Sequence, residues 1–455
     1  MTKKFFGTDG IRGVANTFPI TPDIVLKIGM AVGIKFACDQ QKSRVVIGKD
    51  TRLSGYMIEQ ALTSGLVATG LDVFLVGPVP TPAVAMLTKS LRANAGIMIS
   101  ASHNPYQDNG IKIFHHNGNK LNDQTEQEIE QLILQDLNNY LAPPCSLGKV
   151  KRIDDAKGRY IEFVKNSFPR QQSLSGLKII IDCANGASYN IAPTVLRELG
   201  ATVLEIGTQP DGFNINHNCG STKPQALQEK VLAEQADIGI ALDGDADRLL
   251  IVDDCGNIID GDKLIAIIAE KLHNEGKLKQ DTVAITQMSN LALEDYLNYI
   301  GINTVRTNIG DRYVLEAMQK YGYNFGGEQS GHLILSDYST TGDGLLASLQ
   351  VLSALISSKQ KSHQLANIFT PNPQVLKNIS LTSKQNPLLQ EDVQNFIHLK
   401  QQKLGNKGRI LVRKSGTENL IRIMVEGKKL TEIQEISEEI AQKLSSFQYQ
   451  NKKSF

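Results

Sequence analysis

The stretch Ile179-Ile180-Ile181-Asp182, continued by residues 191–199, Gly200 and Val203-Leu204-Glu205-Ile206-Gly207, decides how this chain folds. A continuous apolar run is typical of a parallel strand that is buried on both faces of a sheet. The amphipathic segment after it predicts a helix, and Gly200 is suited to the left-handed cap that ends such a helix. The second apolar run predicts the next parallel strand.

The same order of segments occurs twice more in the chain. One copy starts at Val45-Val46-Ile47 and passes Gly70, and the other starts at Val283-Ala284-Ile285 and passes Gly301. Three strand–helix–strand units predict three similar α/β domains with mixed sheets. A single large sheet is the alternative, but copies that lie more than ~100 residues apart leave about one domain for each.

The carboxyl end of the chain has a different pattern. Residues 409–413 and 420–425 alternate around a short polar turn, which is typical of two paired strands. Apolar residues at helical spacing predict a helix over residues 430–444, and we expect residues 448–455 to be frayed. The fold class is therefore three α/β domains and a smaller α+β domain, with the boundaries 1–152, 153–255, 256–370 and 371–455.

Length, charge and cysteine content exclude several classes of protein. A chain of 455 residues is too long for one ordinary core. The formal net charge of +1 gives no support for nucleic acid or an anionic membrane as a partner, and no apolar run approaches the ~20 residues of a membrane span. The five cysteines lie far apart and form no Cys-x-x-Cys pair, so reduced thiols in a cytoplasm are the simplest account.

The segment Asp243-Gly244-Asp245-Ala246-Asp247-Arg248 follows an apolar run that predicts a buried strand. Three carboxylates at every second position repel one another, and a hard divalent cation such as Mg²⁺ removes the conflict. A solvated acidic turn is the plain alternative. A calcium loop of the EF-hand kind is a second alternative, but it needs Gly and Glu where Arg248 and Asp254 stand.

A second polar segment, Ser100-Ala101-Ser102-His103-Asn104-Pro105, also follows a predicted buried strand. Ser102, with His103 and the later Lys112, is a candidate nucleophile or phosphate carrier, because catalytic groups often lie on loops where strands end. The alternative is that Ser102 caps a turn before Pro105. The flanking glycines of a Gly-x-Ser-x-Gly elbow are absent.

Three weaker segments offer groups for a sugar phosphate. Residues 326–332 place Glu328, Ser330 and His332 on a glycine-flanked loop, a mixture that suits sugar hydroxyls, although glycine-rich turns are common. Residues 413–419 and Arg422 have the composition of a phosphate-binding turn, with a plain hairpin turn as the alternative. Arg12 lies in a glycine-rich loop near the amino end. A cleft between domains is the natural place for such a ligand.

Together these segments resemble motifs of the α-phosphohexomutase superfamily, in the same order and over nearly the whole chain, from residue 7 to residue 417. The resemblance implies four domains around a central cleft, a phosphoserine and one Mg²⁺ per chain. The serine loop, with Ser100, looks like that of the branch of the family that acts on glucosamine phosphates.

The resemblance also implies roles for individual residues. Ser102 matches the phosphoserine, whose oxygen is a metal ligand beside Asp243, Asp245 and Asp247. The residues that match contacts to the sugar or its phosphate are Glu328, Ser330, Arg413, Ser415, Gly416, Thr417 and Arg422. The residues that match proton handling, charge stabilisation or support of the metal loop are Arg12, Lys112, His332 and Arg248. Lys112 and His332 are both left as candidates for the general base.

The reaction implied by the resemblance is the interconversion of glucosamine 6-phosphate and glucosamine 1-phosphate, on the route to UDP-N-acetylglucosamine. A hexosamine 1,6-bisphosphate serves as intermediate and activator. The alternatives are a phosphoglucomutase or phosphomannomutase, a phosphatase with the same metal loop, and a sugar-phosphate-binding protein without catalysis. We expect a small sugar phosphate as the partner, no nucleic acid, no membrane and a cytoplasmic location, and we leave a homodimer open.

Overall fold

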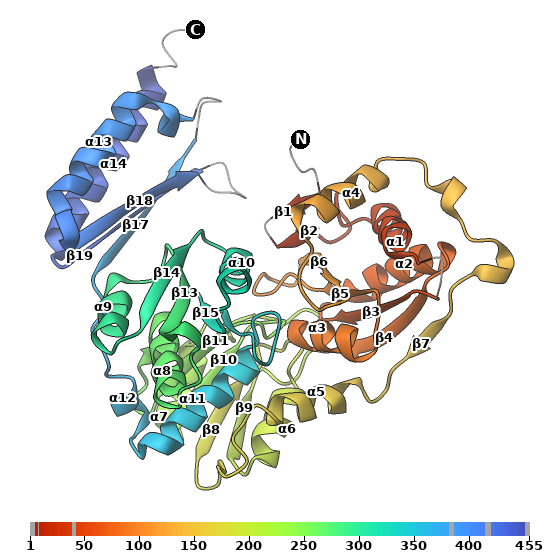
Figure 1. Ribbon diagram of the computed structural model, residues 1–455, viewed down its shortest axis with the longest axis horizontal. Coiled ribbons are helices and arrows are strands. Elements are labelled where there is room, and N and C mark those ends of the chain that lie inside the picture. The colour runs from red at the N-terminus through yellow and green to blue at the C-terminus, as the bar shows by residue number, and fades with distance from the viewer. Residues whose placement is uncertain (1–4, 8, 39–41, 382–385, 415–419, 451–455) are drawn as a thin grey trace. The chain divides into compact units, whose positions relative to one another are not determined.

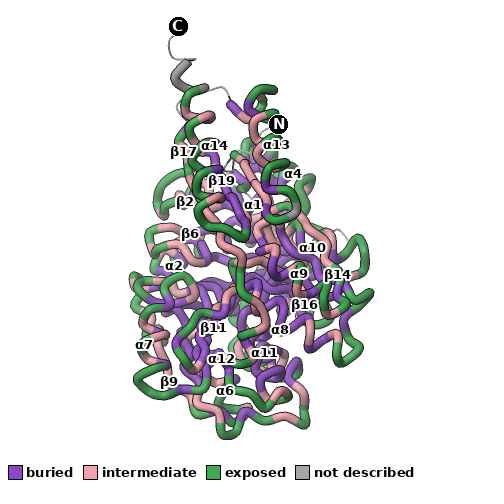
Figure 2. Tube along the Cα trace, turned by 90° about the vertical axis from the view of Figure 1, so that its left-hand side faces the viewer, coloured by how far each residue is buried: buried purple, intermediate pink, exposed green. Residues whose placement is uncertain are grey.

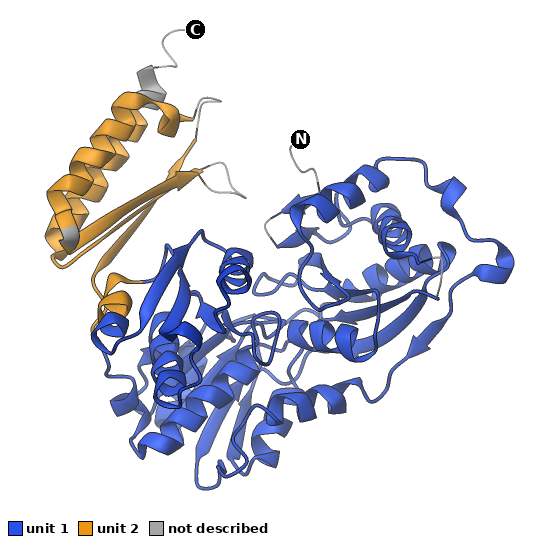
Figure 3. Cartoon of the chain, viewed as in Figure 1, with its two compact units in different colours: residues 1–289, 296–368 blue, residues 290–295, 369–455 orange. Residues whose placement is uncertain are grey.

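The computed structural model describes residues 5–7, 9–38, 42–381, 386–414 and 420–450. The chain forms two compact units, and Figure 3 colours them separately. Unit 1 consists of residues 1–289 and 296–368, and unit 2 consists of residues 290–295 and 369–455. Each unit is described by itself.

The first sheet of unit 1 has seven strands in the order β1-β2-β6-β5-β3-β4-β7 (Figure 1). The neighbouring strands β5, β3, β4 and β7, which end at one edge of the sheet, are parallel to one another. The strands β6, β2 and β1 on the other side pair antiparallel with their neighbours. The strands are Phe6–Gly7 (β1), Gly10–Val14 (β2), Arg44–Lys49 (β3), Asp72–Pro78 (β4), Ala95–Ile99 (β5), Asp108–His115 (β6) and Val150–Arg152 (β7). The helices that accompany them are Pro22–Phe36 (α1), Gly55–Ala68 (α2), Thr81–Ser90 (α3) and Asp123–Ile133 (α4).

The second sheet has five strands in the order β12-β11-β10-β8-β9. The parallel strands are β9, β8 and β10, and β11 turns back antiparallel to β10. The strands are Lys178–Asp182 (β8), Thr202–Ile206 (β9), Ile238–Leu242 (β10), Leu249–Asp253 (β11) and Ile258–Ile259 (β12), and the helices are Ala156–Lys165 (α5), Ile191–Glu198 (α6) and Gln225–Ala233 (α7). Because β12 pairs with β11, this sheet extends past the boundary that we predicted at residue 255.

The third sheet has four strands in the order β14-β13-β15-β16, with β16 antiparallel to β15 and the others parallel. The strands are Thr282–Thr286 (β13), Asn303–Thr307 (β14), Phe325–Gly327 (β15) and Leu333–Leu335 (β16). The helices are Gly261–Asn274 (α8), Leu291–Tyr299 (α9), Asp311–Tyr321 (α10), Gly344–Ser358 (α11) and Ser362–Leu365 (α12).

Unit 2 contains an antiparallel sheet in the order β17-β19-β18 and two long helices. The elements are Gln374–Ser380 (β17), Glu391–Leu404 (α13), Gly408–Lys414 (β18), Leu420–Gly427 (β19) and Leu430–Gln450 (α14). Short 3-10 turns complete the two units at Asn138–Tyr140, Pro144–Ser146, Lys279–Asp281, Pro387–Leu389 and Gly405–Lys407. The expected fraying from residue 448 is wrong for residues 448–450, because α14 continues to Gln450.

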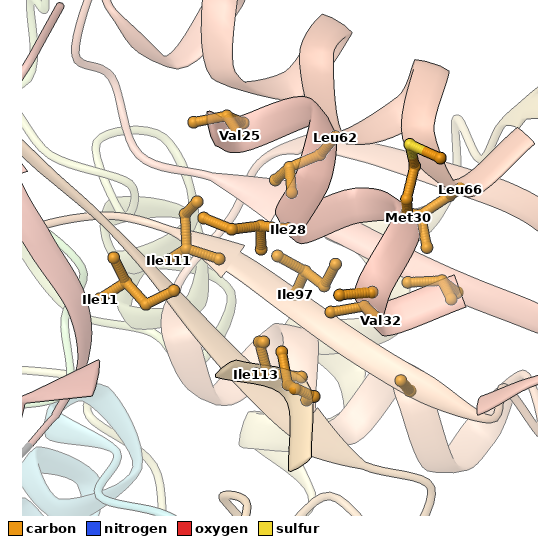
Figure 4. Close-up of a cluster of buried hydrophobic side chains, with 14 of the residues drawn as sticks. Ile11, Val25, Ile28, Met30, Val32, Leu62, Leu66, Ile97, Ile111 and Ile113 are labelled. Carbon is orange, nitrogen blue, oxygen red and sulfur yellow. The ribbon is translucent and has the colours of Figure 1, made fainter. Parts of the chain in front are cut away.

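Apolar side chains from helices and strands form the core beside the first sheet. Ile11 on β2, Ile97 on β5 and Ile111 on β6 meet Ile28 on α1 and Leu62 on α2, and Figure 4 labels them within this cluster. The strands β3, β5, β10 and β13 are buried along nearly their whole length. Figure 2 colours the Cα trace by burial, with buried residues in purple and exposed residues in green. This burial confirms the interpretation of continuous apolar runs as strands covered on both faces.

The three predicted strand–helix–strand units are present as β3-α2-β4, β8-α6-β9 and β13-α9-β14, each with parallel strands. The glycines after their helices, Gly70, Gly200 and Gly301, have φ angles of 93°, 104° and 84°. Only glycine adopts such angles without strain, so these residues turn each chain segment back toward the sheet. No described helix is both long enough and apolar enough to cross a lipid bilayer.

Asp343 caps the amino end of the buried helix α11. Its carboxyl group should make the free energy of unfolding of this protein depend on pH. Its carboxylate accepts hydrogen bonds from Leu346 N and from Tyr160 Oη, both at 2.9 Å, and burial raises its pKa from 3.8 to about 6. Because the folded pKa is the higher one, the stabilising contribution is complete below about pH 4 and is lost as the pH rises through 6.

We expect Asp343→Asn to remove this dependence while the amide still accepts the bond from Leu346 N. Relative to the variant, the wild type should lose about 3 kcal/mol of unfolding free energy between pH 4 and pH 7. Urea titrations at several pH values measure this difference. Parallel pH curves for the two proteins would contradict the prediction.

Candidate active site

The acidic loop lies in the second sheet, between the antiparallel strands β10 and β11. Residues 243–248 form this loop, and Ala246 has a φ of 56° and donates its N–H to Asp243 O at 3.0 Å. The tight turn brings the side chains of Asp243, Asp245 and Asp247 to one place. All three are buried, and each offers a ligand atom within 4.8 Å of the others.

The electrostatics of this cluster call for a cation. Burial raises the pKa of Asp243 to about 8, and the carboxylates of Asp247 and Asp245 raise it as well. One oxygen of Asp245 and one of Asp247, Oδ1 in each case, are buried without a hydrogen-bond partner in the described part of the chain. Buried carboxylate oxygens are costly unless they are paired or bind a metal. The residues therefore fit a hard divalent cation such as Mg²⁺, which prefers oxygen ligands.

Ser102 lies at the acidic cluster, although it belongs to the loop after β5 in the first sheet. Its hydroxyl donates to Asp243 Oδ2 at 2.6 Å, and the residue is 1% exposed. A Cβ on Gly244 would lie 2.6 Å from Ser102 O, so the two loops approach closely only because residue 244 is glycine. The structure thus brings together two segments that are 141 residues apart in the chain.

Lys112 and His332 both contact the acidic cluster. Lys112 Nζ lies 2.8 Å from Asp245 Oδ2 and 3.1 Å from Asp247 Oδ2. Burial lowers the pKa of Lys112, but these carboxylates and Asp9 outweigh it and hold the pKa well above its usual value. His332 Nδ1 lies 3.7 Å from Asp247 Oδ1, and carboxylates raise its pKa against the effect of burial. A cation on the aspartates would weaken the attraction of these carboxylates for both Lys112 and His332. Either residue is therefore a candidate for the general base.

Arg12 and Arg248 give the space near Ser102 a positive character. Arg248 donates its backbone N–H to Asp243 Oδ1 at 3.2 Å, and Arg12 Nη2 lies 2.5 Å from Asp9 Oδ2. The Nε atoms of both arginines are buried and have no hydrogen-bond partner among the described residues. Both arginines also affect His103. Burial lowers the pKa of this imidazole, and the positive charges of Arg248 and Arg12 lower it further, to about 4. Unpaired guanidinium donors beside a buried hydroxyl suit a phosphoryl group.

The glycine-flanked loop that we predicted to contact a sugar joins β15 to β16. Glu328 Oε1 accepts the N–H of Gly310 at 3.0 Å, and burial raises the pKa of Glu328. Ser330 is exposed on the same turn. Leu249 N donates to Gly331 O at 3.0 Å, and residues Arg248 and His332 form an isolated β-bridge. The acidic loop and the predicted sugar loop are therefore joined through their backbones.

Unit 2 holds the predicted phosphate-binding residues. Arg413 on β18 and Arg422 on β19 lie opposite each other, and burial and then Arg422 lower the pKa of Arg413. Like charges placed directly opposite on neighbouring strands destabilise a sheet, and a bound anion relieves them. Ser415, Gly416 and Thr417, which we predicted to complete this site, lie outside the described residues.

Models of a protein family match the chain in four consecutive regions. They are phosphoglucomutase/phosphomannomutase alpha/beta/alpha domain I over residues 3–139, domain II over 158–256, domain III over 260–371 and the C-terminal domain over 376–443. The chain belongs to the phosphoglucomutase/phosphomannomutase family. The family that the motifs predicted is thereby confirmed, as is the fold class of three similar α/β domains and a smaller C-terminal domain.

Curated relatives match over nearly the full length of the chain. The chain is 55% identical over 438 residues to the phosphoglucosamine mutase of Granulibacter bethesdensis, with 96% of each chain covered. It is also 55% identical over 427 residues to the phosphoglucosamine mutase of Parvibaculum lavamentivorans, with 94% of this chain and 95% of the relative covered.

Solved structures share the fold of this chain. A family protein from Burkholderia thailandensis superposes with a TM-score of 0.81 at 24% identity, over 97% of both chains. The N-acetylphosphoglucosamine mutase of Aspergillus fumigatus, solved with GlcNAc-6P and magnesium, gives a TM-score of 0.68 at 17% identity, over 97% of this chain and 95% of the other.

Three polar residues of the site were missed as candidates. Lys120 Nζ bridges Asp9 Oδ1 and Asp311 Oδ2, both at 2.5 Å, and Asp311 Oδ2 lies 3.2 Å from His332 Nε2. These ion pairs connect the segment between β1 and β2, the segment after β6 and the start of α10, and they reach the predicted catalytic residue His332. Asp9 stood inside a glycine-rich segment that the sequence singled out, whereas Lys120 and Asp311 follow no local pattern that would identify them.

Proposed function

We propose that this protein acts as a phosphoglucosamine mutase, which interconverts glucosamine 6-phosphate and glucosamine 1-phosphate. The observation that carries the chemistry is the hydroxyl of Ser102, held 2.6 Å from Asp243 in a buried cluster of three carboxylates. The hexosamine preference rests on relatives of that name that are 53–55% identical to this chain over nearly its full length. The protein is accordingly an isomerase.

In the proposed reaction, Ser102 Oγ carries a phosphoryl group and passes it to O1 or O6 of a hexosamine monophosphate. The Oγ–P bond breaks as the sugar O–P bond forms. The proton of the sugar hydroxyl goes to a base, either Lys112 or His332, and the departing Ser102 Oγ takes up a proton to become a hydroxyl again. The resulting 1,6-bisphosphate turns round and returns its other phosphoryl group to Ser102 Oγ. Phosphoryl transfer of this kind depends on positioning and charge stabilisation.

The remaining predicted residues support this chemistry. Mg²⁺ held by Asp243, Asp245, Asp247 and an oxygen on Ser102 would neutralise charge on the transferred group. The Nε donors of Arg12 and Arg248, which have no hydrogen-bond partner among the described residues, suit the same group. Glu328 and Ser330 are proposed to bind sugar hydroxyls. Arg413, Arg422, Ser415, Gly416 and Thr417 are proposed to bind the phosphate that does not react.

A coupled assay tests the proposal with glucosamine 6-phosphate, Mg²⁺ and a trace of hexose 1,6-bisphosphate. We expect turnover that depends on the bisphosphate and releases no inorganic phosphate. Release of phosphate without any response to the bisphosphate would indicate a phosphatase, which uses water as the acceptor. Binding of the sugar phosphate without turnover would indicate a non-catalytic protein.

A phosphoglucomutase or phosphomannomutase remains the alternative, because the matching family models are described by those two activities. Rates on glucosamine, glucose and mannose 6-phosphates, compared as kcat/KM, separate the possibilities. The proposal requires the largest value for glucosamine 6-phosphate. A cytoplasmic location and a homodimer stay predictions, and light scattering of the purified protein tests the second.

Replacing Arg413 with glutamine should weaken substrate binding, because a charged donor to the distant phosphate is lost. We expect KM for the sugar phosphate to rise roughly tenfold or more. Unit 2 should become more stable by up to about 1 kcal/mol, because Arg413 no longer faces Arg422. Steady-state kinetics and thermal melting measure the two effects.

Lys414→Gln is the matched control for this variant. Lys414 is exposed and follows Arg413 on the same strand, so its side chain points to the opposite face of the sheet. It should change neither KM nor stability. An equal rise of KM in both variants would mean that only the overall charge matters.

A further inference from the structure

Arg52 and Asn216 donate hydrogen bonds to the same two carbonyl oxygens of the serine loop. Ser102 O accepts from Arg52 Nη2 at 2.9 Å and from Asn216 Nδ2 at 2.9 Å. Asn104 O accepts from the same two nitrogens at 2.8 Å and 3.0 Å. Arg52 follows strand β3 of the first sheet, whereas Asn216 lies between β9 and α7 of the second. The loop is thus held from two sheets at once.

All three nitrogens of the Arg52 guanidinium donate hydrogen bonds to the serine loop or to residues that contact it. The side chain is buried, its Nε donates to Asp50 Oδ2 at 2.8 Å, and its Nη1 donates to Asp108 O at 3.0 Å and to Pro105 O. Asp50 Oδ2 also accepts the hydroxyl of Ser100 at 2.6 Å. A planar fork with five donors can serve several carbonyls in fixed directions, which a lysine cannot do.

The serine loop needs such support because of its backbone conformation. Ser102 has a φ of 51°, in the left-handed region that serine rarely adopts. The second sheet reaches the first at a further point, where Thr81 N donates to Asp245 O at 2.9 Å. The distance between Ser102 Oγ and the acidic cluster therefore depends on contacts that cross from one sheet to the other.

We propose that Arg52 and Asn216 are positioning residues for phosphoryl transfer, which act by holding Ser102 in its left-handed conformation at the acidic cluster. The inference rests on the proposed function and adds two residues to it. Arg52 is paired with Asp50 and with backbone carbonyls, and it acts through Ser102 rather than on the substrate. The displacement of a reacting group by about 1 Å can cost roughly 100-fold in rate, so their effect should be on kcat.

The test compares Asn216→Ala with Asn218→Ala. Asn218 is exposed, lies in the same loop and has a φ of 52° against 57° for Asn216, so the alanine strains the backbone equally in both. We expect kcat of Asn216→Ala to fall by about 10- to 100-fold relative to Asn218→Ala, with KM within about threefold of wild type. Amide hydrogen exchange should become faster at residues 100–108 in Asn216→Ala alone.

Arg52→Lys keeps a cation beside Asp50 but removes the fork. It should lower kcat at least as much as Asn216→Ala, and if it does not fold, the asparagine pair decides the question. Equal kcat values for the two asparagine variants, or unchanged exchange at residues 100–108, would overturn the inference. A wild type that does not turn over glucosamine 6-phosphate would refute the proposed function instead. Hydrogen exchange at residues 100–108 would still test whether Asn216 holds the serine loop in place.

Discussion

Replacing Ser102 with alanine should abolish mutase turnover, with a loss in kcat of roughly 10⁴-fold or more, as expected when a covalent nucleophile is removed. The fold should persist, because within the described part of the chain the hydroxyl hydrogen-bonds only to two side chains, Asp243 Oδ2 at 2.6 Å and His103 Nδ1 at 3.3 Å. Activity with glucosamine 6-phosphate and intact-protein mass after treatment with the bisphosphate measure the result. Wild type should gain one phosphoryl group, and Ser102→Ala should gain none.

Thr81→Val provides the matched control for Ser102→Ala. Thr81 also contributes a hydroxyl to the acidic cluster, and it donates to Asp245 Oδ2 at 2.5 Å. Its replacement by the isosteric valine removes a hydrogen bond but leaves Ser102 in place, so kcat should stay within about tenfold of wild type. The protein should still accept one phosphoryl group. Substantial turnover by Ser102→Ala, or phosphorylation lost only in Thr81→Val, would contradict the role of Ser102.

The sequence predicted those parts of the site that lie within one short segment. The apolar run before Asp243 and the alternating carboxylates after it identify a buried strand and a cation loop by local rules. The three repeated units followed from apolar runs and their glycine caps in the same way. The strand β17 and the helix α13 of unit 2 were not predicted, although the pair β18 and β19 and the helix after it were.

The residues that were missed act through tertiary contacts. Lys120 becomes part of the site because it bridges Asp9 and Asp311, which are 302 residues apart in the chain. Arg52 and Asn216 matter because they reach the same carbonyl oxygens from different sheets. An isolated lysine, arginine or asparagine in a loop is usually solvated, so its sequence position carries no signal of such a role. The proximity of Ser102 to Asp243 was expected only through the family resemblance.

Removal of the metal should stop turnover, and proton release should accompany metal binding. Three buried carboxylates repel one another, and burial raises the pKa of Asp243 to about 8. Near neutral pH the metal-free site therefore holds a proton on Asp243, which a cation must displace. We expect the affinity for Mg²⁺ to fall by up to about tenfold for each pH unit below 8. Calorimetric titration of the metal-free protein between pH 6 and pH 9 measures this slope.

Asp243→Asn should lose both the activity and the pH dependence. The amide cannot hold a proton that competes with the metal, and it removes one of the three negative charges that bind the cation. We expect kcat to fall by at least about 100-fold at saturating Mg²⁺, because an electrostatic stabiliser of the transferred group is weakened. Chelation should inactivate the wild type, Mg²⁺ should restore it, and the melting temperature of Asp243→Asn should no longer rise with Mg²⁺.

Asp211→Asn separates this effect from a general loss of negative charge. Asp211 is an exposed residue whose carboxylate caps its own loop, accepting from Phe213 N at 2.7 Å and Asn214 N at 2.9 Å. An asparagine can accept the same bonds, so activity, metal affinity and the pH slope should all remain as in wild type. If Asp243→Asn also kept them, the acidic cluster would not be the metal site. The buried Asp245 Oδ1, which has no hydrogen-bond partner among the described residues, would then need another partner.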